Sequence, residues 1–289
     1  MSQDEMETVR KLNPEAVSVA RTPAPARSHP EGGAQLNSIA DLPDGAPEQD
    51  ARHPVVILIH GIRTCSLWQS EIQATLRNGG VVAHLTHYEY FDLLRFLAPG
   101  PYFRRRVIEK VKTQIRHIVQ DSAPAPVSVI AHSFGAYVFA QIFRECPDLA
   151  FDRIIFCGSV APSSFRLEDH ETRFNAPLIN EIGARDVWPA IAEAVTFGYG
   201  SAGTYGFRRP FVRDRRHHGF AHSDFLNAGF CRKYWLPWLR GGEYIEGDAP
   251  KPARSPRWLY LFVIFNIRTL LAFLLLWFGA PYARAYWGG

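Results

Sequence analysis

The chain has 289 residues, of which 47% are apolar and 21% are charged, and its formal net charge is +4. This composition excludes a collagen-like chain, a coiled coil and a wholly disordered chain, and the length suffices for one large domain or two small ones. The four cysteines are scattered without a CxxC pair, which argues against a disulfide framework and a structural zinc site. Because the basic residues form no long run, we expect no nucleic-acid partner.

The first 51 residues differ from the rest of the chain. They hold six Pro, eight Ala, nine acidic and four basic residues, and no aromatic residue. A segment of this kind cannot bury enough apolar surface to offset the entropy of ordering, so we expect residues 1–51 to be disordered. Residues 1–11 lack the apolar run of a secretory signal. We expect one folded domain over residues 52–243.

Apolar runs and amphipathic patterns alternate within that domain. Continuous apolar runs bounded by Pro and Gly are typical of buried parallel strands, and apolar residues three and four apart are typical of helices. The predicted strands are 55–59, 81–88, 127–131, 154–157 and 178–182, and the predicted helices are 68–78, 104–120 and 134–145. This alternation implies an α/β fold with a mostly parallel sheet and helices on both faces.

The third predicted strand runs directly into Ala131-His132-Ser133-Phe134-Gly135, and a predicted helix follows at once. A small-x-Ser-x-small pentapeptide between a strand and a helix is typical of a nucleophile elbow, where the serine occupies a sharp turn and small neighbours let other backbone approach. Ala131 stands where the usual G-x-S-x-G pattern has its first Gly. Ser133 is therefore the candidate nucleophile.

Two backbone amides are candidates for stabilising an oxyanion beside Ser133. The amide of Phe134 lies at the N-terminus of the predicted helix, where unpaired amides and the helix dipole favour an anion. The second donor is expected in the loop after the first strand. That loop begins with His60-Gly61, and the glycine lets the amide of Ile62 or Arg63 turn inward.

With these motifs the sequence resembles the α/β-hydrolase superfamily, in particular its lipase- and esterase-like serine hydrolases. The resemblance covers about residues 53–243 and rests on the segments 57–61 and 131–135, on an acid after a later strand and on a late histidine. It implies the chain order Ser, then Asp or Glu, then His. The sequence gives no sign of a metal or redox cofactor.

The resemblance implies that the base is a histidine on a loop just before the last helix. His222 fits this position, because a basic, extended segment before it gives way to a helical one. His217 and His218 are the alternatives, although we expect them to be solvated within the basic cluster 213–216. His170 comes too early to follow a suitable acid.

The resemblance places the acid just beyond a strand, between the nucleophile and the base. Asp186 fits, because the strand 178–182 ends, Gly183 turns the chain and Asp186 follows in the loop. The same residue would also cap a helix over 187–194, and the two roles are compatible. The weaker candidates for the acid are Asp152, Glu168, Asp169 and Glu171, with Asp214 as a backup.

Two further patterns indicate no separate site. Residues 198–203 read Gly-x-Gly-x-x-Gly, but no strand precedes them and no helix clearly follows. We interpret this segment as a flexible loop near the mouth of the site and not as a dinucleotide site. His84 and His87 would point to opposite faces of a strand and have no further ligand nearby, so they predict no metal site.

Residues 258–280 form a long apolar stretch with fourteen Leu, Ile, Val or Phe residues and with Asn266 and Arg268 near its middle. At about −0.5 kcal/mol each, the apolar residues outweigh about +3 kcal/mol for the arginine, and the helix would span about 34 Å. We expect a single C-terminal membrane helix after a linker over 244–257. An amphipathic helix on the membrane or a helix packed on the domain are the alternatives. The excess of basic residues before the stretch puts the domain in the cytoplasm.

The sequence therefore predicts a membrane-tethered serine hydrolase that cleaves a small-molecule or lipid ester or thioester. The nucleophile, base and acid are Ser133, His222 and Asp186. The oxyanion donors are Phe134 and Ile62. A non-catalytic, membrane-anchored interaction protein on a hydrolase scaffold and an acyltransferase are the alternatives.

Overall fold

The computed structural model describes residues 53–62, 67–88 and 102–249, together with four single residues nearer the C-terminus. The predicted disordered segment 1–51 lies outside the described residues, as do most of the predicted linker and membrane helix. The four single residues are helical and exposed: Thr269, Phe273, Leu274 and Trp277. None of the helices within the described ranges combines the length and the apolarity that a bilayer span requires.

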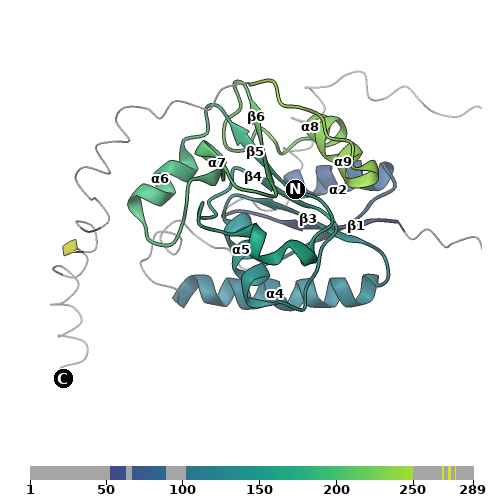
Figure 1. Cartoon of the computed structure of the whole chain (residues 1–289), viewed down its shortest axis with the longest axis horizontal. Helices are drawn as coiled ribbons and strands as arrows, with labels where there is room; N and C mark the ends of the chain where they lie inside the picture. Colours follow the sequence, from purple (N-terminus) through teal and green to yellow (C-terminus); the bar gives the residue numbers. More distant parts are fainter. Residues whose placement is uncertain are drawn as a thin grey trace, which may run out of the picture. The chain divides into compact units, whose positions relative to one another are not determined.

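Six parallel strands form one sheet in the order β2-β1-β3-β4-β5-β6 (Figure 1). The strands are β1 Val55–Ile59, β2 Val82–Leu85, β3 Val127–His132, β4 Ile154–Cys157, β5 Leu178–Gly183 and β6 Val212–His217. β2 is shorter than the predicted strand 81–88, and β6 is formed by the basic segment that precedes the late histidine. Because the strands are parallel, the loops that follow β1, β3 and β5 lie along one edge of the sheet, where ligands bind in open α/β sheets.

Helices cover both faces of the sheet, as predicted. The helices are α2 Leu67–Asn78, α4 Tyr102–Ser122, α5 Phe134–Glu145, α6 Trp188–Val195, α7 Ala202–Tyr205, α8 Ala228–Phe230 and α9 Leu236–Gly241, with a 3-10 segment Leu167–Arg173 and a π turn Cys231–Trp235. α4 and α5 cover one face, and α2, α8 and α9 lie over the other (Figure 1). Alternate residues of β1 enter the two apolar cores. A strand covered on both faces must be apolar throughout, which explains the continuous run at 55–59.

The domain extends further than the sequence predicts. Residues 244–249, expected to begin the linker, pack along β6 instead. Tyr244 and Ile245 pack against the core beneath α9. A Cβ on Gly247 would lie 2.1 Å from the carbonyl oxygen of Arg216, and the amide of Ala249 donates to the same oxygen at 3.2 Å. The predicted boundary at residue 243 is therefore too early.

Candidate active site

Ser133 occupies a strained turn between β3 and α5. Its backbone angles are φ 55° and ψ −119°, a region that residues with a side chain rarely adopt. Two backbone hydrogen bonds hold the turn: the Ser133 amide donates to the carbonyl of Cys157 at 2.9 Å, and the Ser133 carbonyl accepts from Ala136 at 3.1 Å. The end of β4 therefore supports the elbow from the side.

The small residues that flank Ser133 have different roles. A Cβ on Gly135 would lie 2.5 Å from the carbonyl oxygen of Ile59 and 2.6 Å from that of His60, so only glycine lets the end of β1 pass over the start of α5. Ala131 stands at the other small position, and its methyl group is fully buried within the sheet. The departure from a Gly at that position is thus accommodated.

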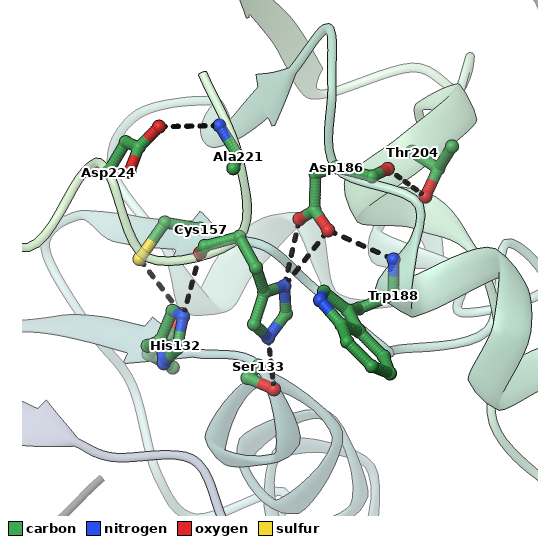
Figure 2. A network of polar contacts seen from close by, with 10 residues as sticks. His132, Ser133, Cys157, Asp186, Trp188, Thr204, Ala221 and Asp224 are labelled. Carbon is green, nitrogen blue, oxygen red and sulfur yellow. Dashed lines mark hydrogen bonds and ion pairs between the residues drawn. The ribbon is translucent and has the colours of Figure 1, made fainter.

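Ser133, His222 and Asp186 form one hydrogen-bonded chain. His222 Nε2 lies 2.9 Å from Ser133 Oγ, and His222 Nδ1 lies 2.9 Å and 3.1 Å from the two carboxylate oxygens of Asp186. Because an ionised carboxylate only accepts, Nδ1 carries the ring proton, and Nε2 of the neutral ring is left to accept the proton of the Ser133 hydroxyl. Figure 2 shows Ser133 and Asp186 at the two ends of this line of contacts.

Asp186 is fixed by the start of α6 and by α7. Its Oδ1 accepts from the amide of Trp188 at 3.1 Å, and its carbonyl accepts from the Thr204 hydroxyl at 2.9 Å (Figure 2). The side chain therefore binds an amide at the beginning of α6 and the His222 ring at the same time. A Cβ on Gly183 would lie 2.4 Å from the carbonyl oxygen of Phe220, so this glycine lets the loop with His222 approach.

His132 supports the loop that carries His222, a role that the sequence analysis missed. His132 Nε2 lies 3.0 Å from the backbone carbonyl oxygen of His222, so it donates to that oxygen. Burial, and to a smaller extent the nearby His222 ring, lowers the pKa of His132 to about 3. The ring is therefore neutral at physiological pH. The sequence shows this residue only as a variable position of the pentapeptide.

The loop after β1 contacts Ser133, the candidate nucleophile. A Cβ on Gly61 would lie 2.8 Å from Ser133 Cβ and 3.3 Å from Ser133 Oγ, so the glycine permits this contact. Ile62, the predicted second oxyanion donor, comes directly after it, and Phe134 is the first residue of α5. Arg63, the alternative donor, lies outside the described residues.

The prediction that the basic cluster 213–216 and the adjoining His217 and His218 are solvated is wrong for Arg215 and His217. Arg215 and His217 are buried around Glu181, which is 0% exposed. Arg215 Nε donates to the Glu181 carboxylate at 2.9 Å, His217 Nε2 lies 2.8 Å from it and Trp235 Nε1 donates to it at 3.0 Å. Burial alone would raise the pKa of Glu181, but the bonds from Arg215 and His217 outweigh burial and hold that pKa below its usual value. His217 is thus committed to another carboxylate.

Asp214, the backup acid, is also committed elsewhere. Its Oδ1 accepts from the Asn180 side chain at 2.8 Å and from the amide of Phe207 at 3.1 Å, and its Oδ2 accepts from the amide of Arg208 at 3.0 Å. These bonds fix the turn that leads into β6. Asp186 is therefore the candidate acid that contacts His222.

The segment 198–203 is packed, so the prediction of a flexible loop is wrong. A Cβ on Gly200 would lie 2.3 Å from Pro162 Cα, and a Cβ on Gly203 would lie 2.3 Å from the amide nitrogen of Ser159. The glycines serve close backbone packing. Within the described part of the chain, no three His, Cys, Asp or Glu side chains gather as metal ligands do.

The topology and the elbow together identify the fold. A parallel sheet covered on both faces, a serine on a strained strand-to-helix turn after the central β3, and the chain order Ser, Asp, His are the features that define it. The chain has the α/β-hydrolase fold. Its sheet lacks any antiparallel strand among the residues that the structure describes.

No family model and no curated protein matches the sequence. Solved structures to which the chain is similar include a predicted CIB-like hydrolase from Thermoplasma acidophilum, with 16% identity, 66% of this chain and 88% of that chain covered, and a TM-score of 0.46. The esterase domain of a Rhodothermus marinus protein has 15% identity, coverage of 68% and 90%, and a TM-score of 0.41. Est1E from Butyrivibrio proteoclasticus has 15% identity, coverage of 62% and 84%, and a TM-score of 0.38.

Proposed function

We propose that the protein is a serine hydrolase that cleaves carboxylic esters or thioesters through an acyl-enzyme. The observation that carries the proposal is the hydrogen-bonded chain from Ser133 Oγ through His222 to the buried carboxylate of Asp186. A serine hydroxyl is a weak nucleophile unless a base takes its proton, and an imidazole held in one tautomer by a carboxylate is such a base. Asp186 is 1% exposed, so little water competes for that carboxylate.

The proposed reaction has two halves. In the first, Ser133 Oγ attacks the substrate carbonyl carbon while His222 Nε2 takes the hydroxyl proton, and Asp186 stabilises the resulting imidazolium. His222 then gives the proton to the leaving alcohol or thiol, and the acyl group stays on Ser133. In the second half, the water oxygen attacks the acyl carbon while His222 Nε2 takes a proton from the water. The bond between the acyl carbon and Ser133 Oγ then breaks, His222 gives its proton to Oγ, and the carboxylic acid is released. General acid–base catalysis of this kind contributes about 10²–10⁴-fold.

The oxyanion that forms in each half is assigned to the amides of Phe134 and Ile62. Phe134 begins α5, whose N-terminus carries partial positive charge, and Ile62 follows the glycine that touches Ser133. One such donor contributes about 2.7–4 kcal/mol to transition-state stabilisation. The two contributions are not fully additive.

The enzymatic proposal is tested with a fluorophosphonate probe, which labels activated serine hydroxyls. Wild-type protein is expected to be labelled, and Ser133→Ala, which removes only the Oγ atom, is expected to remain unlabelled. Labelling that survives Ser133→Ala, or folded wild-type protein that is not labelled, contradicts the proposal. The second result favours a non-catalytic interaction protein. A panel of p-nitrophenyl esters of increasing chain length, with and without acceptor alcohols, then separates hydrolysis from acyl transfer.

We also propose that residues 258–280 tether the domain to the cytoplasmic side of a membrane, which suits a lipid or acyl-chain ester as substrate. The support is the apolar stretch itself, in which the exposed rings of Phe273 and Trp277 stack at 6.0 Å. Of these two residues, Trp277 is of the type that favours the membrane interface. Removal of residues 250–289 is expected to move the protein from the membrane to the soluble fraction on centrifugation. Persistence at the membrane contradicts the tether.

A further inference from the structure

Tyr88 and His60 together hold the loop that carries the second proposed oxyanion donor. The Tyr88 hydroxyl lies 2.5 Å from the carbonyl oxygen of His60 and 3.1 Å from that of Gly61, so its single proton is shared between two adjacent carbonyls. His60 Nδ1 lies 2.8 Å from the same Gly61 oxygen. Because a carbonyl only accepts, His60 donates through Nδ1. The Gly61 carbonyl therefore receives two hydrogen bonds.

The two rings also support each other. They stack with centroids 3.9 Å apart and planes 15° apart. His60 is 7% exposed and Tyr88 is 8% exposed, so water has little access to these bonds. Burial lowers the pKa of His60 from its ordinary value, which keeps its ring neutral. Tyr88 also forms a T-shaped ring contact with Phe134, the residue that begins α5, at a centroid distance of 6.3 Å.

Hydrogen bonds to β1 and to α4 fix the backbone of the two residues before Tyr88. Thr86 donates through its amide, at 3.0 Å, and through its hydroxyl, at 3.1 Å, to the carbonyl of Leu58 in β1. The side chain of Gln114 in α4 binds the amide of His87 at 2.8 Å and its carbonyl at 2.7 Å. Because the backbone that carries it is held in this way, the Tyr88 ring has one position next to the loop after β1.

We infer that Tyr88 is a positioning residue for the oxyanion hole and that it acts through the peptide unit between Gly61 and Ile62. That unit is planar and trans, so its C=O and its N–H point in opposite directions. Anchoring the Gly61 carbonyl therefore fixes the direction of the Ile62 N–H, the donor that we propose, which comes directly after the glycine that contacts Ser133. Hydrogen bonds to the carbonyl also polarise the amide, which makes its N–H a stronger donor.

The inference rests on the proposed function, and its test has one readout that is independent of activity. Tyr88→Phe removes the hydroxyl but keeps the ring that stacks on His60. Tyr137→Phe is the matched control, because Tyr137 is equally buried and also packs on Phe134, with ring centroids 5.9 Å apart, but lies on α5. Both variants are made in the full chain.

With p-nitrophenyl butyrate, Tyr88→Phe is expected to lower kcat at least tenfold while KM stays within twofold. The shape of the pH profile is expected to stay unchanged, because the Tyr88 hydroxyl binds the carbonyls of His60 and Gly61 while His222 is held by Ser133 and Asp186. Tyr137→Phe is expected to keep kcat within twofold. A Tyr88→Phe variant that turns over like the control, or that loses activity only through a higher KM, overturns the inference.

The second readout is the ¹⁵N–¹H signal of the Ile62 amide in protein labelled at isoleucine. Tyr88→Phe is expected to shift this signal and Tyr137→Phe to leave it in place, since the Ile62 nitrogen shares its peptide unit with the anchored carbonyl. An Ile62 signal that does not move in Tyr88→Phe overturns the inference whether or not the protein hydrolyses esters. Absence of fluorophosphonate labelling in the wild type would instead overturn the proposed function.

Discussion

Two histidine–carboxylate pairs lie close to the same edge of the sheet, and only one of them faces a hydroxyl nucleophile. His222 Nδ1 lies 2.9 Å from Asp186, and His217 Nε2 lies 2.8 Å from Glu181; both carboxylate side chains are 0% exposed. The pairs differ at the second ring nitrogen. His222 Nε2 contacts Ser133 Oγ, whereas His217 Nδ1 has no hydrogen-bond partner among the described residues. The contact of the second ring nitrogen, and not the distance to the carboxylate, therefore distinguishes the two pairs. We propose that the His222–Asp186 pair is catalytic and that the His217–Glu181 pair is structural.

The surroundings of the two pairs differ as well. The His217 ring is enclosed by the rings of Phe220, Phe225, Phe230 and Tyr234, at centroid distances of 4.9–5.8 Å. The charge of Glu181 is balanced by the buried guanidinium of Arg215. The His222 side chain is 20% exposed, so substrate and water can reach it. The His217–Glu181 pair thus joins β5 to β6, and the His222–Asp186 pair is the one that we propose to exchange protons.

The largest expected effect comes from replacing the carboxylate of the His222–Asp186 pair. Asp186→Asn keeps the size of the side chain but removes the charge that stabilises the imidazolium and permits the wrong tautomer. We expect kcat for ester hydrolysis to fall by about 10⁴-fold. Glu181→Gln is the matched control, and its kcat per folded molecule is expected to stay within a few-fold of wild type. An Asp186→Asn variant with near-normal kcat would remove the distinction between the pairs.

The next effect concerns the His217–Glu181 pair and is measured as the free energy of unfolding. Glu181→Ala leaves Arg215 buried without its carboxylate, and this is expected to lower the free energy of unfolding by about 3–5 kcal/mol in urea titrations. Replacing both residues with Met removes the uncompensated charge. The double variant is therefore expected to be more stable than Glu181→Ala. Equal stability of the two variants would show that the ion pair is not what holds this region.

A third buried imidazole, that of His132, donates to a backbone carbonyl instead of a carboxylate, and its pKa of about 3 makes stability depend on pH. The folded ring stays neutral, while the unfolded chain takes up a proton below its ordinary pKa of about 6.5. The stabilisation is therefore fully present above about pH 6.5 and is lost as the pH falls toward 3, at about 1.4 kcal/mol per pH unit.

His132→Gln keeps a donor near the Nε2 position but cannot titrate in this range. Urea unfolding at pH 7 and pH 5 is expected to show a loss for wild type that exceeds the loss for the variant by about 2 kcal/mol. The difference between the two proteins is the measure, since other groups titrate in both. If both proteins lose the same stability over this interval, the folded ring takes up a proton after all.

The strands and the residues of the proposed triad were predictable because their signals are local. A strand covered on both faces must be a continuous apolar run, and four of the five predicted strands match the structure to within one residue. Ser133 was marked by the strand–turn–helix setting. Asp186 and His222 followed from the resemblance to the α/β-hydrolases, which implies an acid just beyond a strand and a histidine before the last helix.

The other features were hidden because their partners are distant in the sequence. Arg215 and His217 suggested a solvated segment, and only the pairing of β6 with β5 brings them to Glu181. His132 and Tyr88 act on backbone carbonyls, and no residue type in the sequence identifies a carbonyl as a partner. Such contacts become visible only when the chain is folded.

The smallest expected effect concerns the end of the domain, which contacts Arg215, the partner of Glu181. Arg215 Nη1 donates to the carbonyl of Ile245 at 2.9 Å. The ring of Tyr244 packs beside the same guanidinium, with its centroid 5.4 Å from Arg215 Cζ. A chain that ends at Ala249 keeps these contacts, whereas a chain that ends at Glu243 loses them. The shorter chain also loses the bonds of Asp248 to the His218 amide and of the Ala249 amide to the Arg216 carbonyl. We expect it to be less stable by about 2 kcal/mol in urea titrations, from these three hydrogen bonds, of which the one to Asp248 is exposed, and from the partly buried apolar surface.

The two truncated chains also separate stability from catalysis. Residues 244–249 contact β6 and, through Asp248, the amide of His218 at the start of the loop with His222. The His222 ring itself is held by Asp186 and Ser133. The rate at which a fluorophosphonate labels Ser133 is therefore expected to be equal in both chains at a temperature where both are folded. Equal stability of the two chains would return the domain boundary to residue 243. A slower labelling rate in the shorter chain would mean that the region around Glu181 supports the His222–Asp186 pair. We do not expect this result, because the two carboxylates have separate contacts.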